Sequence, residues 1–461
     1  MPSMNTYFDT FDREKEALLK EFFQLLRFRG LSADLKTMPE LLACANFLEK
    51  KLADLGGKVE KWSIDGHPPV VFAEFKSENK DAPTLLIYNH YDVQPVDPEN
   101  LWDSPPFEPT IRDGKIYARG AEDNKGQLFY SLTALQIYLK KVKSIPFHLK
   151  WVIEGEEEHG STALHQLLPK YKDKVKADGI LVIDVDMHNF AKPSICLGVR
   201  GIVTMDLKVT GPKGDLHSGS CGGAVLNPIH YLVHILDQAR TADGKINIPG
   251  FYDQVKTLSD SEKKLFTFES AQELSHVTGV PPAGGEKGFS SGEQTTIRPT
   301  LEINGIYGGY SGDGFKTVLP SEAFAKVSCR LVPDQNPEEI GKGVKKYFES
   351  KSNPSAKVEV HLHGTGGSSV QCSPKSFLTN AANRAVQATF EKKAEYNLAG
   401  GSIPVAADLA HFSGGTLLFV GTGLPTDNIH APNEHFSLEQ LRYGTSLIGH
   451  LFEYFVEEFN R

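Results

Sequence analysis

The chain has 461 residues, 40% of them hydrophobic and 23% charged, with a formal net charge of −9; this length exceeds one typical core and predicts two domains. The acidic balance argues against binding to nucleic acid, and the lack of any apolar run approaching roughly 20 residues argues against a membrane span. Five cysteines are scattered without CxxC spacing, which predicts a reducing compartment, the cytoplasm, and no cysteine metal site.

The first 198 residues alternate between helical and strand patterns. Apolar residues at helical spacing predict helices at 13–28, 39–55, 127–139 and 161–168. Short apolar runs predict strands at 69–75, 84–89, 147–154 and 179–184. This alternation is typical of an α/β fold whose central sheet is mostly parallel and flanked by helices.

Residues 199–368 have a different character. The runs "GIVTMDLKVTG", "RPTLEINGIYGG" and "AFAKVSCRLV" alternate apolar and polar residues, as strands with one exposed face do. Helices are predicted at 228–240 and 337–350, with a long stretch rich in Gly, Ser and Pro after the first. Helix and strand patterns like those of the first 198 residues resume near residue 373. We therefore predict an α/β domain formed by 1–198 and 369–461, interrupted by an inserted α+β domain at 199–368.

Polar residues follow the carboxyl ends of the predicted strands. His90 and Asp92 close the strand at 84–89, and residues two apart on a strand point to the same side. The same placement holds for Asp123 in a glycine-flanked turn, for the run "EGEEEHGS", for Asp184 and for "NIHAPNEH". Because parallel strands bring their carboxyl ends to one edge, these groups should meet in one crevice.

Several carboxylates in one crevice repel one another unless a cation neutralises them. Two histidines together with carboxylates form the usual ligand set of zinc-like ions. The sequence thus predicts a metal centre, for which zinc, manganese and cobalt are all chemically compatible.

The set HxD, GxxDxKG, EGxEExGS and a late histidine resembles the M20 family of co-catalytic metallopeptidases, in the right order over nearly the whole chain. A closer likeness, to the branch with cytosolic nonspecific dipeptidase and carnosinase, rests on "NHYDVQP", "LGVRG", "DLHSG", "FKTVLP", "CRLVP" and "GGSIP". The resemblance implies hydrolysis of the peptide bond in dipeptides or short peptides by water activated by two divalent metal ions per subunit, with zinc expected first.

The resemblance also implies roles for individual residues. The implied ligands are His90 and Asp184 on one metal, Asp123 bridging both metals, and Glu158 and His430 on the other. Asp186 lies close to Asp184, so the choice between them stays open, although the spacing from Asp178 and Pro193 favours Asp184.

Glu157 matches the family's general base, because the flanking "EG" and "GS" fix the register of the three glutamates. A carboxylate outside the metal shell can remove a proton from water and deliver it later. Asp92 can hold the second ring nitrogen of His90, which a metal-bound imidazole requires. The resemblance further implies a cis peptide bond after Asp123.

The inserted domain resembles the family's lid, through which subunits pair. This implies a homodimer in which His217 of "DLHSG" reaches the neighbouring subunit's metal site and binds the oxyanion. Thr317, Arg330 and Ser402 resemble the groups that hold the carboxylate and backbone of the peptide, and arginine suits a carboxylate through its bidentate geometry.

Two departures from the branch concern the substrate. Leu398-Ala399 stands before "GGSIP" where a charged pair is usual, and Asn124 stands where a second aspartate is common. One alternative is therefore an N-acyl amino acid deacylase or desuccinylase-type amidohydrolase on the same fold. A second is a non-catalytic peptide-binding relative, against which the intact Glu157 and full ligand set argue.

Overall fold

The computed structural model describes residues 6–461, which divide into two compact units. Within the described residues, unit 1 comprises 6–198, Cys372–Asn397 and Val405–Arg461, and unit 2 comprises Val199–Gln371 and Leu398–Pro404. The catalytic and lid roles expected for the two regions remain predictions.

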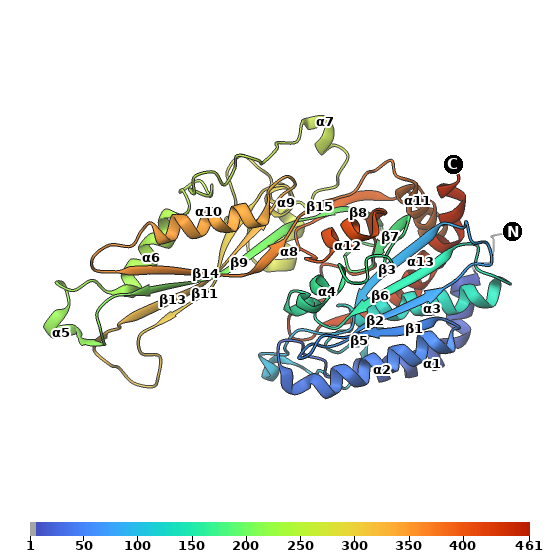
Figure 1. Cartoon of the computed structure of the whole chain (residues 1–461), viewed down its shortest axis with the longest axis horizontal. Helices are drawn as coiled ribbons and strands as arrows, with labels where there is room; N and C mark the ends of the chain where they lie inside the picture. Colours follow the sequence, from blue (N-terminus) through green and yellow to red (C-terminus); the bar gives the residue numbers. More distant parts are fainter. Residues whose placement is uncertain (1–5) are drawn as a thin grey trace. The chain divides into compact units, whose positions relative to one another are not determined.

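Unit 1 is built on a mixed sheet with the order β1-β2-β6-β3-β7-β17-β8 (Figure 1). Its strands are β1 (Lys58–Trp62), β2 (Val70–Phe75), β3 (Thr84–His90), β6 (His148–Glu154), β7 (Gly179–Val182), β8 (Ser194–Val199) and β17 (Thr416–Phe419). The central strands β6, β3, β7 and β17 run parallel, and the outer pairs are antiparallel. The predicted α/β class with a largely parallel centre is confirmed. β3 is buried from Leu85 to His90 because both of its faces are covered.

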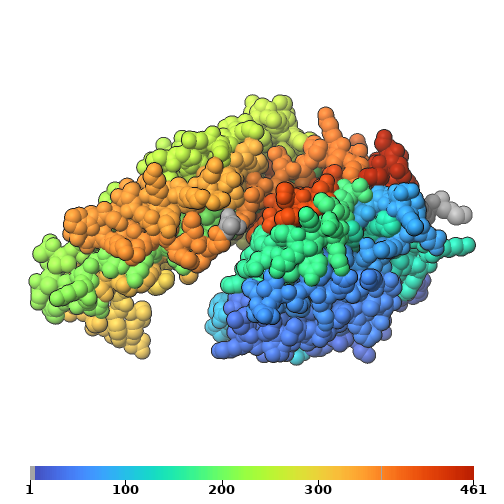
Figure 2. All heavy atoms as spheres, viewed as in Figure 1, coloured from blue at the N-terminus to red at the C-terminus, as the bar shows by residue number. Residues whose placement is uncertain are grey.

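Helices cover this sheet. They are α1 (Thr6–Leu26), α2 (Met38–Asp54), α3 (Lys125–Lys141), α4 (Thr162–Leu167), α11 (Phe377–Phe390), α12 (Ala406–Ser413) and α13 (Leu438–Phe459). α13 packs against α1, α3 and α11, while α2 packs on β1 and β2. Figure 2 shows the N-terminal segments, in blue, forming a broad part of the surface of unit 1. α1 starts earlier than the predicted range of 13–28.

Short elements complete unit 1. They are η1 (Leu35–Thr37), η2 (Glu99–Leu101), η3 (Glu157–His159), β4 (Thr110–Arg112), β5 (Lys115–Tyr117), β16 (Glu395–Ala399) and β18 (His435–Ser437). β18, β5 and β4 form a small separate sheet. This sheet places the segment before β18 beside the turn before α3, because His435 pairs with Tyr117.

Unit 2 contains an antiparallel sheet with the order β11-β13-β9-β14. Its strands are β9 (Gly201–Thr210), β11 (Thr300–Gly308), β13 (Glu322–Leu331) and β14 (Lys357–Gly367), and α6 (Pro228–Gln238) and α10 (Pro337–Glu349) pack on one face. The side chains of β9 alternate between buried and half-buried, as the predicted one-sided strand requires. Their inward face joins Leu232, Val344 and Phe348 in the core.

Several short elements of unit 2 lie outside this sheet. They are β10 (Leu216–His217), α5 (Ser218–Cys221), α7 (Asp260–Lys263), α8 (Ala271–Thr278), α9 (Ser291–Thr296), β12 (Val318–Leu319) and β15 (Val370–Gln371). Helices α7, α8 and α9 lie in the stretch rich in Gly, Ser and Pro, for which no helix was predicted. Each begins with a serine capping box, which satisfies backbone N–H groups at the helix start. Within residues 6–461, every helix is too short or too polar to span a lipid bilayer.

Candidate active site

The central sheet of unit 1 delivers the predicted polar residues to one edge. His90 is the last residue of β3, Asp184 lies two residues past β7, and Glu158 lies in η3 just after β6. Asp123 precedes α3, and His430 lies between β17 and β18. The parallel direction of the central strands therefore assembles groups that are far apart in the sequence.

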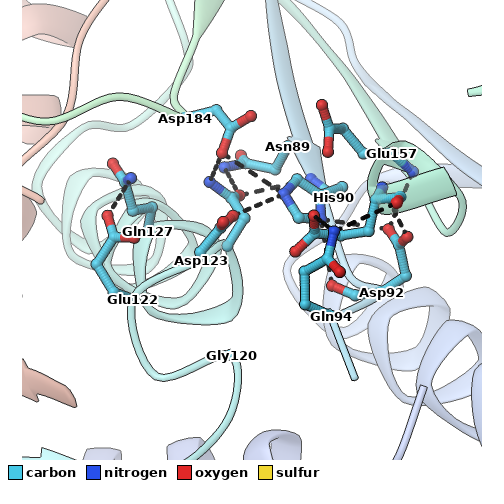
Figure 3. Close-up of polar contacts among 12 residues, drawn as sticks. Asn89, His90, Asp92, Gln94, Gly120, Glu122, Asp123, Gln127, Glu157 and Asp184 are labelled. Carbon is cyan, nitrogen blue, oxygen red and sulfur yellow. Dashed lines mark hydrogen bonds and ion pairs between the residues drawn. The ribbon is translucent and has the colours of Figure 1, made fainter. Parts of the chain in front are cut away.

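These residues form two groups that share Asp123. His90 Nε2 lies 3.0 Å from Asp123 Oδ1 and 3.5 Å from Asp184 Oδ1. His430 Nε2 lies 2.9 Å from Asp123 Oδ2 and 3.2 Å from Glu158 Oε2. Within each group the potential ligand atoms lie within 4.8 Å of one another. Asp123 thus offers a different oxygen to each group, and Figure 3 shows Asp123 and Asp184 beside the His90 ring.

The donor set suits divalent cations. Imidazole nitrogens and carboxylate oxygens are the ligands that zinc and similar ions take in proteins. Within the described residues 6–461, Glu158 Oε1 is buried without a hydrogen-bond partner, although buried polar atoms are normally paired. A cation between these side chains would satisfy this oxygen.

The pKa values of the site residues are shifted because several carboxylates lie close together. Burial raises the pKa of Glu158 to about 7, and the neighbouring Asp123 carboxylate adds to this rise. Burial alone would lower the pKa of His430, but Asp123 and Glu158 raise it to about 11. The pKa of His90 is likewise raised by carboxylates against the effect of burial. Divalent cations would favour the ionised carboxylates and neutral imidazoles instead.

The carboxylate of Asp92 contacts both the ring of His90 and the backbone of the turn after β6. Its Oδ1 lies 3.2 Å from Nδ1 of His90, on the opposite side of the ring from Asp123. Its two oxygens also accept the backbone N–H groups of Glu157 and Glu158, at 3.2 and 3.0 Å. Asp92 lies just past the end of β3 rather than on the strand. One buried carboxylate therefore connects the candidate ligand His90 to the turn that carries Glu157.

Glu157 lies half-buried at the edge of the two groups and is drawn near His90 in Figure 3. Burial is the largest cause of its pKa rising well above the usual range, and Asp184, Glu158 and Asp123 contribute through charge repulsion. Divalent cations would counter this rise, so the position of Glu157 beside both groups is what suits a general base.

Asp184 and Asp186 have different surroundings in the structure. Asp184 belongs to the His90 group and accepts a 2.6 Å hydrogen bond from Nδ2 of Asn124. Asp186 instead pairs through its backbone with Gly423, and it belongs to neither group. The peptide bond between Asp123 and Asn124 is cis, as predicted.

Sequence reasoning assigned no role to three residues that support this site. Gln94 Nε2 donates to Glu158 Oε2 at 2.8 Å. Glu434 is fully buried, forms a 2.8 Å ion pair with Arg119 and accepts the backbone N–H of Asp123. Gln94 and Glu434 occur in the motifs "NHYDVQP" and "NIHAPNEH", but nothing in a motif distinguishes a supporting residue from a ligand.

Unit 2 holds the other four predicted residues in two separate places. His217 in β10 and Thr317 before β12 are adjacent, because the backbone of Thr317 accepts the N–H of Ser218 at 3.1 Å. Arg330, at the far end of β13, donates to Ser402 Oγ at 2.8 Å. The strand between Glu322 and Arg330 spans roughly 25 Å at the usual rise per residue. The two pairs therefore lie too far apart within unit 2 to contact one dipeptide.

The ring of His217 has a defined hydrogen-bonding state. Its Nδ1 accepts the backbone N–H groups of Gly219 and Ser220, at 3.1 and 3.2 Å. The neutral ring therefore carries its proton on Nε2. His217 and Thr317 are exposed, and Figure 2 shows the yellow-orange segment after β11, which leads to Thr317, standing out from unit 2.

Two carboxylate–histidine groups beside a further glutamate are the residues expected of a metal-dependent hydrolase site. Residues 86–454 match the model of peptidase family M20/M25/M40. The match covers most of the chain, which therefore belongs to this family and is a peptidase of the M20 type.

Known relatives agree with the predicted branch. The chain is 29% identical to the Cys-Gly metallodipeptidase dug1 of Schizosaccharomyces pombe, over 96% of this chain and 97% of that protein. It is 32% identical to the human Beta-Ala-His dipeptidase, over 84% of this chain and 77% of that protein. The solved structure of the di-peptidase Dug1p from Saccharomyces cerevisiae superimposes with a TM-score of 0.88 at 27% identity, covering 99% of both chains. The predicted resemblance to the dipeptidase branch is confirmed.

Proposed function

We propose that this protein hydrolyses the peptide bond of dipeptides or other short peptides, with two divalent metal ions per subunit and Glu157 as the general base. The observation that carries the proposal is that the two carboxylate oxygens of Asp123 face different histidines. Oδ1 faces His90, and Oδ2 faces His430. A carboxylate placed in this way suits a bridge between two ions. His90 and Asp184 would hold one ion, and Glu158 and His430 would hold the other.

The metals and the protein would divide the chemistry. When bound, the ions lower the pKa of water and polarise the scissile carbonyl. Zinc is the proposed metal, and manganese or cobalt would accept the same ligands. Glu157 takes the proton of the attacking water and delivers it to the leaving amine. Asp92 keeps the imidazole of His90 in one orientation and keeps Glu157 beside it.

Residues of unit 2 would bind the rest of the substrate. His217 has its proton on Nε2 and can donate a hydrogen bond to the oxyanion of the tetrahedral intermediate. Arg330, supported by Ser402, offers a guanidinium for the carboxylate of the peptide. Thr317 beside His217 can contact the peptide backbone.

We further propose that the active form is a homodimer through unit 2. His217 pairs with Val318 of β12, close to the start of β13, and Arg330 lies at the other end of β13, roughly 25 Å away. One dipeptide can therefore meet both only if they come from different subunits. Unit 2 also exposes apolar side chains that a partner subunit could cover. They are Val225, Val233, Ile303, Ile306, Tyr307, Tyr310 and Phe315, with Phe315 91% exposed.

The test is a substrate panel. The metal-free protein would be reconstituted with zinc, manganese or cobalt and then assayed on dipeptides of varied sequence, tripeptides and N-acyl amino acids. We expect dipeptides to give the highest kcat/KM. Preferred turnover of N-acyl amino acids would replace the proposal with the amidohydrolase alternative, and no turnover with two ions bound would favour the peptide-binding alternative.

A further inference from the structure

Three consecutive glutamates follow β6, and the first of them faces away from the metal ligands. The Glu156 carboxylate lies 2.9 and 3.0 Å from Nδ1 of His67, which lies in the connection between β1 and β2. Its Oε2 also accepts the backbone N–H of Ala163 at 2.9 Å, in the first turn of α4. The residue is 5% exposed. Glu156 is therefore a buried carboxylate with a complete set of partners outside the metal site.

The backbone of Glu156 closes the same turn. Its carbonyl oxygen accepts the N–H groups of His159 and Ser161, at 3.2 and 2.8 Å. Gly160 and Ser161 have φ values of 90° and 54°, in the left-handed region that a serine seldom adopts. The chain thus reverses sharply between Glu157 and α4, and Glu156 contacts both sides of the reversal.

The carboxylate of Asp92 holds the opposite side of this turn. Asp92 accepts the N–H groups of Glu157 and Glu158, and Ser32 donates to the same carboxylate at 2.6 Å. Asp92 therefore fixes the two backbone positions on the metal side, whereas Glu156 fixes the turn to α4 and to the β1–β2 connection. The backbone that carries Glu157 and Glu158 is therefore held by buried carboxylates on both sides of the turn.

We propose that Glu156, held by His67, is a positioning residue that keeps Glu157 in place for proton transfer. This inference rests on the proposed function, because it assigns Glu156 an effect on the reaction through Glu157. A general base acts only within hydrogen-bond reach of its proton, and a displacement near 1 Å can cost about 100-fold in rate. Removing the Glu156 carboxylate would leave the Ala163 N–H and His67 without their partner and loosen the turn.

The first variants change Glu156 itself. Glu156→Ala should lower kcat at least about tenfold, with KM within twofold and both metal ions retained. Glu156→Gln should restore most of kcat, because its carbonyl oxygen can accept the Ala163 N–H and its amide can donate to Nδ1 of His67. A merely structural role would not lower kcat per metal-loaded subunit while leaving KM unchanged.

The second set changes the partner, which matters if Glu156→Ala fails to fold. His67→Ala should lower kcat in the same direction, and His67→Asn should recover it because asparagine places an amide nitrogen near the position of Nδ1. His159→Ala is the matched control, since His159 is an exposed histidine of the same turn, and it should leave kcat unchanged. Combining His67→Ala with Glu156→Ala should add little to the single Glu156 effect.

Amide hydrogen exchange of residues 157–163 gives a readout that needs no substrate. We expect faster exchange in Glu156→Ala than in wild type, and wild-type exchange in Glu156→Gln. If wild type hydrolysed no dipeptide, the proposed function would fail, while unchanged exchange in Glu156→Ala would overturn the positioning role alone. The positioning role would also be overturned by an unchanged kcat in Glu156→Ala, by an equal loss in Glu156→Gln, or by loss of metal from the alanine variant.

Discussion

The candidate residues of unit 1 and those of unit 2 differ in what holds them. In unit 1, His90 is fully buried and contacts carboxylates through both ring nitrogens. Asp184 and Glu158 each accept a hydrogen bond from a neighbouring amide side chain. In unit 2, His217 and Thr317 are exposed, and Arg330 lies at the other end of a ten-residue strand.

This difference teaches how the two units divide the work. The groups of unit 1 are preorganised by their own buried partners, so we expect them to bind cations without help from unit 2. The groups of unit 2 have no common centre within that unit, so their use depends on a substrate or a second subunit. We therefore expect changes in unit 1 to alter metal content, and changes in unit 2 to alter rate or KM alone.

The strongest test of this comparison removes Asp123, the proposed shared ligand. Asp123→Ala should lose both metal ions and reduce turnover at least about 10⁴-fold, since the metals supply the nucleophile. Metal content is measured by elemental analysis of the dialysed protein. Asp186→Asn is the matched control and should keep two ions, because Asp186 belongs to neither group. Two retained ions in Asp123→Ala would contradict the bridging role.

Glu157→Gln should separate proton transfer from metal binding within unit 1. The amide keeps the size of the side chain but cannot take a proton, so turnover should fall at least about 100-fold. Metal content and thermal unfolding should stay near wild type. Steady-state kinetics on the best dipeptide measures the effect, and a loss of only a few-fold would mean that the base or its register is misassigned.

For substitutions in unit 2, the comparison predicts that kcat falls while both metal ions stay bound in unit 1. His217→Ala removes one oxyanion donor, worth roughly 3 to 4 kcal/mol or about 100- to 1000-fold in kcat, and both ions should remain bound. His361→Ala, an exposed histidine on β14, is the control and should keep full activity.

The same variant tests whether His217 acts across subunits. His217→Ala protein mixed with Glu157→Gln protein would give mixed dimers with one site that has both an intact base and an intact histidine. Their activity should return towards half of the wild-type value. Isolated mixed dimers without recovery would mean that His217 serves its own subunit or only the structure.

The smallest effect is expected for Arg330→Lys. Lysine keeps the charge but cannot form a bidentate pair with a carboxylate, so KM should rise about tenfold while kcat changes little. Lys326→Ala removes a cation from the same strand and should leave KM unchanged. A fall in kcat at constant KM would show that Arg330 acts on the reaction itself rather than on peptide binding.

The periodic parts of the fold were predictable from the sequence. The alternation along β9 and the apolar run of β3 reflect burial of one or two faces, which the residues encode directly. The positions of His90 and Asp184 followed from the ends of parallel strands, whereas Asp123 follows β5 of the small antiparallel sheet. Helices α7, α8 and α9 were missed although Ser259, Ser270 and Ser290 each precede a glutamate by three residues, because a capping box has little weight without an apolar pattern.

Other features depend on contacts that no local pattern carries. Glu156 and Glu157 are chemically identical neighbours, but the Glu156 carboxylate contacts His67, 89 positions away. The Glu434 partner Arg119 is 315 residues distant. These pairings depend on the tertiary fold, so they cannot be assigned from residue type alone.

The order of strands in the central sheet has a consequence for the synthesis of this protein on the ribosome. β17 is inserted between β7 and β8, although more than 200 residues of chain separate it from β8. A nascent chain that ends before Thr416 therefore exposes two unpaired strand edges, which invite aggregation. His430 emerges later still, so a growing chain cannot complete the second proposed ligand group before residue 430 has been made. Binding of the second proposed cation would then require β17 and the segment after it to be in place.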